Sequence, residues 1–196
     1  MKREASLSPR VVPVVTRTDG ISLYPFVETH MSEVTDVLVA IDTKAVLDRY
    51  GRNNSMSNPP LIDAKHVFMI VTQKNVVSGQ AGGELDVAAR IGDVIRWREN
   101  SLSLGFEESC IFYKFVSSQV KLISDPSPRE AEVKIPVPNP DDPSKPKKQQ
   151  VSNYFWSCET LKTGRVTYHF QFQILDRSGN LCGCYQWDPF ISIRND

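Results

Sequence analysis

The sequence predicts an all-β protein, an antiparallel Greek-key β-sandwich of the immunoglobulin, cupredoxin or jelly-roll kind with one short helix near residues 43–50. Short apolar or alternating segments recur along the chain, with Gly, Pro, Asn and Asp between them. Residues 166–174 alternate apolar and polar side chains, as a strand with one wet face does. The 196 residues, 40% of them hydrophobic, suffice for one packed core.

The first regular segments lie in the N-terminal half. Residues 34–41 include a run of branched apolar residues at 37–41, which is typical of a strand buried on both faces, and residues 66–72 show the same pattern. Asp42 is placed to cap a helix over residues 43–50, and Gly51 is placed to end it. These features predict a strand, a helix of one or two turns and a second strand.

The strongest strand pattern is near the C-terminus. Residues 176–180 have the composition of a turn, and residues 181–187 are predicted to return as the partner strand of a hairpin. The face of the first strand that we expect in the core carries Val166, Tyr168, Phe170, Phe172 and Ile174.

The domain organisation follows from shifts in composition. Residues 1–33 mix Pro, Ser, Thr and charge and are predicted to form an N-terminal extended arm, while residues 34–196 form a single β-sandwich domain. Residues 124–150 hold seven of the 13 prolines. Because proline removes a backbone donor, we expect this segment to be an exposed loop that does not pair in a sheet.

The charge is balanced, with 23 basic and 23 acidic residues. A net charge of zero gives no attraction to nucleic acid or to an anionic membrane, and it provides little repulsion against self-association. The chain shows neither the pattern of a signal peptide nor an apolar run of membrane-spanning length. We therefore expect a cytoplasmic protein with reduced cysteines, no nucleic-acid or membrane partner, and a tendency to form homo-oligomers.

Four stretches together resemble one protein family. They are residues 37–43, Gly92-Asp93-Val94-Ile95-Arg96-Trp97, residues 112–115, and Trp187-Asp188-Pro189-Phe190, in that order along the chain. This set resembles the PixA/AidA inclusion-body proteins from about residue 34 to the C-terminus. The resemblance implies a protein that accumulates in the bacterial cytoplasm, sometimes as inclusions, in bacteria that live with or attack hosts. It implies no established reaction and no catalytic residue.

One possible site is a metal centre near the C-terminus. Cys182 and Cys184 are two residues apart on a predicted strand and therefore share a face, and His169 lies on the neighbouring strand. With Cys158 the set would reach the four ligands of structural zinc. Buried free thiols are the commoner role of cysteine, so the sequence favours packed thiols and no cofactor.

A second possible site is a ligand surface built from aromatic and polar loop residues. Trp97 and Trp187 could form part of an aromatic platform, and the Asn-rich loop after residue 51 could bind hydroxyl groups or a weakly held calcium ion. The candidate ligand-binding residues are Asp42, Asn53, Asn54, Asn58, Trp97, Trp187 and Asp188.

Three functional hypotheses follow. The leading one is a non-catalytic, self-associating protein that acts as an accessory or host-interaction factor, because the chain has no nucleophile elbow, no metalloprotease pair and no phosphate loop. The alternatives are a lectin-like carbohydrate-binding module, with a glycan or host-derived ligand, and a cysteine-ligated metal-binding sandwich.

Overall fold

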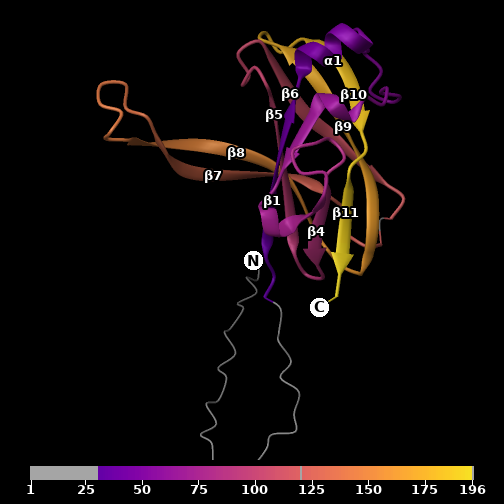
Figure 1. Cartoon of the computed structure of the whole chain (residues 1–196). Coiled ribbons are helices and arrows are strands. Elements are labelled where there is room, and N and C mark those ends of the chain that lie inside the picture. The colour runs from indigo at the N-terminus through magenta and orange to yellow at the C-terminus, as the bar shows by residue number, and fades with distance from the viewer. Residues whose placement is uncertain (1–30, 120, 196) are drawn as a thin grey trace, which may run out of the picture. The chain divides into compact units, whose positions relative to one another are not determined.

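A computed structural model describes residues 31–119 and 121–195 (Figure 1). Residues 32–196 make up one compact unit that consists of two β-sheets and a short helix. The extended arm predicted for residues 1–33 lies outside the described residues, apart from residues 31–33. Among the described residues, no helix has the length and apolar character needed to cross a membrane.

The first sheet has five strands. β1 pairs in parallel with β5, and the other neighbours are antiparallel. The strand order is β2 (Val67–Ile70), β1 (Val34–Ile41), β5 (Val94–Ser101), β8 (Lys147–Glu159) and β7 (Ser127–Val137).

The second sheet is built around β9, which also pairs with β6 (Glu108–Ser117). β11 and β4 are parallel, while the remaining pairs are antiparallel. The strand order is β10 (Leu181–Trp187), β9 (Gly164–Asp176), β11 (Phe190–Arg194), β4 (Asp86–Arg90) and β3 (Val76–Ser78). The predicted mostly-β, two-sheet class is confirmed, although each sheet contains one parallel pair.

The core lies between the sheets and is rich in aromatic rings. The indole N–H of Trp97 on β5 donates to the Tyr168 hydroxyl on β9 at 2.9 Å. The Trp97 and Phe170 rings lie 5.4 Å apart, and Phe112 stacks on Phe170 at 4.4 Å. The five predicted core residues of β9 are all buried, so the alternation at 166–174 is confirmed.

The helix α1 (Thr43–Tyr50) is the one predicted from the sequence. The Asp42 carboxylate accepts a hydrogen bond from the backbone N–H of Ala45 at 3.0 Å, which satisfies one of the free donors at the helix start. Gly51 ends the helix with a φ of 68°, a conformation that glycine adopts without steric strain.

The proline-rich segment is not the loop that the sequence predicted. Residues 127–137 form β7 and pair antiparallel with residues 147–157 of β8. Pro128 and Pro136 lie on β7, which is the edge strand of its sheet, and the edge tolerates a residue without a backbone donor. The other five prolines of the segment lie outside the strands, so the loop prediction was wrong for most of its length.

The two strands predicted to be buried on both faces are buried on one only. Leu38 of β1 is 47% exposed, and Ile70, which lies opposite it on β2, is 42% exposed. The other sides of these strands, including Val37, Val39 and Met69, are buried in the core. The first sheet therefore has an apolar outer surface that the described part of the chain leaves uncovered.

Candidate functional site

The β7–β8 hairpin extends beyond the sheet to which it belongs. β8 pairs with β5 only through residues 156–159, and residues 147–155 have β7 as their strand partner. Figure 1 shows the two strands leaving the sheets as a long two-stranded ribbon. Nine residues of extended chain reach about 30 Å. Such a ribbon is marginally stable in water unless one of its faces is packed.

One face of the hairpin is largely apolar, here called its apolar face, and the other is polar. The register places Val133 opposite Val151 and Ala131 opposite Asn153, so these side chains share a face. The side chains of this face are Ala131, Val133, Ile135, Val137, Val151 and Phe155, together with the polar Arg129, Lys147, Gln149 and Asn153. The polar face carries Glu130, Glu132, Lys134, Gln150, Ser152 and Tyr154.

The polar face satisfies its hydrogen bonds by itself. Gln150 donates to the Glu132 carboxylate at 3.0 Å, the Ser152 hydroxyl also donates to Glu132, and Tyr154 donates to Glu130 at 3.1 Å. The bonds from Ser152 and Gln150 lower the pKa of Glu132, and the bond to Glu130 raises the pKa of Tyr154. This face is suited to water, because its charged groups are solvated and its donors have partners.

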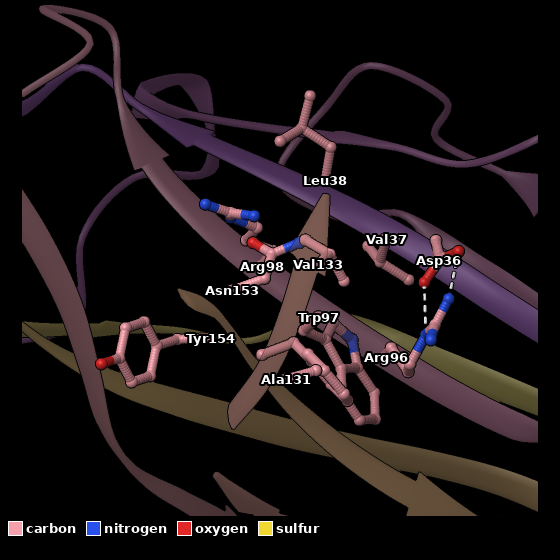
Figure 2. Close-up of a pocket in the computed structure, with 11 residues that line it drawn as sticks. Asp36, Val37, Leu38, Arg96, Trp97, Arg98, Ala131, Val133, Asn153 and Tyr154 are labelled. Carbon is pink, nitrogen blue, oxygen red and sulfur yellow. Dashed lines mark hydrogen bonds and ion pairs between the residues drawn. The ribbon is translucent and has the colours of Figure 1, made fainter. Parts of the chain in front are cut away.

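A groove lies where the hairpin meets the outer face of β1 and β5 (Figure 2). It has a volume of about 440 Å³, and the hairpin forms one wall with Ala131, Val133 and Asn153. The opposite wall comes from β1 and β5, whose lining residues include Asp36, Leu38, Arg96 and Arg98. The apolar face of the hairpin thus continues into the uncovered outer face of the sheet.

One ion pair fixes the wall of this groove. The Arg96 guanidinium donates two hydrogen bonds to the Asp36 carboxylate, at 2.6 and 2.8 Å, and lies 5.3 Å from the Phe155 ring centre. The bond to Asp36 raises the pKa of Arg96. A cation held by both a carboxylate and a ring keeps one orientation, so this wall is rigid.

Two polar groups in the groove have no hydrogen-bond partner among the described residues. The side-chain oxygen of Asn153 is buried without a hydrogen bond. The Arg98 side chain is exposed and makes no hydrogen bond or ion pair with residues 31–119 or 121–195. A buried acceptor without a partner costs about 1–3 kcal/mol. The groove can therefore hold an apolar surface that brings a few polar groups of its own.

The residues of the predicted metal site are not assembled. Cys158 lies on β8 in the first sheet, and the β10 bulge between Leu181 and Gly183 leaves Cys182 in the core while Cys184 is buried outside it. His169 lies on β9 opposite Val116 of β6. Within residues 31–119 and 121–195, no three or more His, Cys, Asp or Glu side chains are placed to hold a metal ion.

The predicted aromatic platform lies in the core. Trp97 is 0% exposed and Trp187 is 1% exposed, so neither ring can stack on a ligand in this conformation. Asp188 beside Trp187 is half-buried, and Asp42 is engaged at the start of the helix.

The predicted Asn-rich loop lies along β10. The Asn53 side chain donates to the Cys184 carbonyl at 3.2 Å, and the Asn53 carbonyl accepts the Cys184 N–H at 2.6 Å. Asn54 is exposed, and the Asn58 N–H donates to the Ser55 hydroxyl at 3.3 Å. The loop covers the edge of β10, and the structure does not bring its asparagines together with the tryptophans.

Our reading of the sequence missed the hairpin residues that line the groove. Their signal is the alternation over residues 130–137, where Ala131, Val133, Ile135 and Val137 are separated by Glu130, Glu132, Lys134 and Pro136. This two-residue period predicts a strand with one apolar face. The high proline content of the segment hid it.

Fold and groove define a class: a two-sheet β-protein that carries an amphipathic hairpin beside an uncovered sheet face. The sequence profile of the PixA family, described as inclusion body protein, matches residues 33–193. The chain therefore belongs to the PixA inclusion body protein family.

One solved structure shares this fold. The crystal structure of a PixA inclusion body protein from Burkholderia cenocepacia has a TM-score of 0.71 and 16% identity, and the match covers 84% of this chain and 98% of that one. Amebosin has a TM-score of 0.26, 9% identity and coverage of 62% and 93%, which is too low for a structural argument. The same holds for a cysteine protease inhibitor from Entamoeba histolytica, with a TM-score of 0.21, 16% identity and coverage of 55% and 84%. No curated protein matches the chain.

Proposed function

We propose that this protein is a non-catalytic assembly protein that self-associates and accumulates in the bacterial cytoplasm as inclusions. The observation that carries the proposal is the largely apolar hairpin face and the apolar outer side of β1 and β2, which meet at a groove that also contains Asp36, Arg96 and Arg98. Exposed apolar patches rimmed by polar groups are typical of interaction sites.

Charge supports the same proposal. The formal net charge is zero, so copies of the chain do not repel one another at neutral pH. The balance of charge also argues against nucleic acid as a partner, because such partners require a basic surface. The family's description as inclusion body proteins supports accumulation at high local concentration.

Light scattering of the purified full-length chain over a wide concentration series tests the proposal. We expect the weight-average molar mass to rise with concentration from the 22.1 kDa monomer to a dimer or a larger species. A mass that stays at the monomer value at every concentration would contradict self-association.

A further inference from the structure

We propose that the β7–β8 hairpin is an exchange arm. Its apolar face packs on the outer face of β1 and β2 of a second copy of the chain, and the arm of that copy packs on this one in return. The inference rests on the proposed self-association and names the surfaces that carry it. The receiving surface consists of Val34, Leu38 and Ala40 of β1 with Phe68 and Ile70 of β2, and Asp36 lies on the same face of β1 between Val34 and Leu38.

The hairpin supplies an apolar face that the described residues leave partly exposed. Ile135 is 39% exposed, and Val133, Val137 and Val151 are only partly buried although they lie on an ordered strand pair. The polar face opposite has its own hydrogen-bond network and needs no cover. Since a two-stranded ribbon gains little stability by itself, a surface that packs on the apolar face would stabilise it.

The first sheet supplies a matching surface. β1 and β2 carry apolar residues on both faces, a pattern typical of strands that are covered on both sides. Among residues 31–119 and 121–195 nothing covers Val34, Leu38 and Ile70, while Ala40 and Phe68 are half-buried. Leu38 and Ile70 lie directly opposite each other. A second copy of the arm would cover the pair and explain the pattern.

The contact uses the face of the hairpin and not its edge. β7 is the edge strand of the sheet, and Pro128 and Pro136 interrupt its row of backbone donors. A partner strand could therefore not pair along the whole of β7. The apolar face has no such obstacle.

The area of the contact favours reciprocal exchange between two copies. An arm about 30 Å long and two strands wide has a face of about 300 Å². A single arm resting on a partner would bury about 600 Å² in total, which is in the range of weak crystal contacts. Two reciprocal arms would bury at most about 1,200 Å², the lower bound of stable, specific interfaces. A symmetric dimer is therefore the smallest assembly in which the arm makes a stable contact.

The tip of the arm argues against a lipid bilayer as the surface that it meets. Residues 138–146 contain no aromatic or large aliphatic side chain. They carry Asp141 and Asp142, and Asp142 forms an ion pair with Lys145 at 2.9 Å. Placing charged side chains in the apolar part of a membrane is costly.

Two double variants of the full-length chain test the inference by sedimentation equilibrium. Val133→Gln with Ile135→Gln changes the apolar face, and Glu132→Gln with Lys134→Gln changes the polar face of the same strand. Each double variant leaves the net charge unchanged and introduces two glutamines. We expect the first to raise the dimer dissociation constant at least tenfold and the second to leave it within threefold of wild type. Leu38→Gln on the receiving surface should also raise it at least tenfold.

Circular dichroism and thermal unfolding check that the variants fold. If the first double variant does not fold, Val151→Gln on the other strand of the same face replaces it. If the wild type and the apolar-face variant dimerise with the same dissociation constant, the exchange-arm proposal is wrong, while the proposed self-association still holds. A wild type that remains monomeric would overturn both. Binding of that monomer to phosphatidylcholine vesicles would assign the apolar face to a bilayer.

Discussion

The carboxylate of Glu99 is poorly solvated. The residue lies half-buried on β5, where its carboxylate accepts the backbone N–H of Phe112 at 3.2 Å. Desolvation raises the pKa of Glu99 despite this hydrogen bond. The folded state therefore binds the Glu99 proton more tightly than the unfolded state, whose glutamate pKa is about 4.3.

Replacing Glu99 by glutamine should stabilise the protein near neutral pH. The favourable contribution of protonated Glu99 is fully present below the unfolded pKa and is lost as the pH rises through the folded pKa. Urea unfolding of Glu99→Gln and wild type between about pH 4 and pH 8 should show the variant more stable at the upper end and the difference closing on acidification. The exposed Glu159→Gln is the control and should show no such trend. Equal stability of Glu99→Gln and wild type throughout would contradict the burial of this carboxylate.

The four cysteines should be inert in the native protein. All four are buried, and desolvation raises the pKa of Cys158 to about 12. The thiolate is the reactive form, and it is scarce at such a pKa. With a thiol reagent near pH 8, none should react rapidly in the folded chain and all four should react after unfolding. Rapid native reaction of Cys182 and Cys184 would contradict their placement and reopen the metal site.

At the scale of elements, the helix start can be tested with a matched pair. Asp42→Ala removes the carboxylate that accepts the Ala45 N–H and should lower the free energy of unfolding by about 1 kcal/mol. Asp48→Ala removes only an exposed ion pair with Lys44 and should cost about 0.5 kcal/mol or less. Urea unfolding measures both. Equal losses would mean that Asp42 does not act as a cap.

The strand over residues 166–174 could be predicted from the sequence, because its two-residue period is local. Residues 166–174 and the cap at Asp42 needed no knowledge of distant contacts. The hairpin was missed because we gave the seven prolines more weight than the alternation of residues 130–137. A strand tolerates proline when it is the edge strand of its sheet, as β7 is. That is a property of the topology.

The candidate site could not be predicted from the sequence, because its position also depends on the topology of the sheets. A tryptophan can pack in a core or lie at a surface, and only the arrangement of the sheets places Trp97 and Trp187 inside. The sequence predicted that β1 and β2 are covered on both faces, yet residues 31–119 and 121–195 cover one face only. The difference between the predicted and the observed cover is the reason for proposing a second copy as the covering surface.

For the whole molecule, the nature of the proposed contact determines its response to salt. The two surfaces are mostly apolar and the chain has no net charge, so ions have few interactions to screen. The dimer dissociation constant should change less than about threefold between low salt and ten times that concentration. A steep weakening with salt would show that charge pairs hold the copies together.

The surfaces that touch can be identified directly by photo-crosslinking from position 135. A photoreactive amino acid replaces Ile135 in isotopically heavy chains, which are mixed with light chains, and mass spectrometry identifies the linked peptides. We expect links between heavy and light chains that join position 135 to peptides containing residues 34–41 or 67–70. Links confined to a single chain, or links to another surface of the second copy, would contradict the exchange of arms.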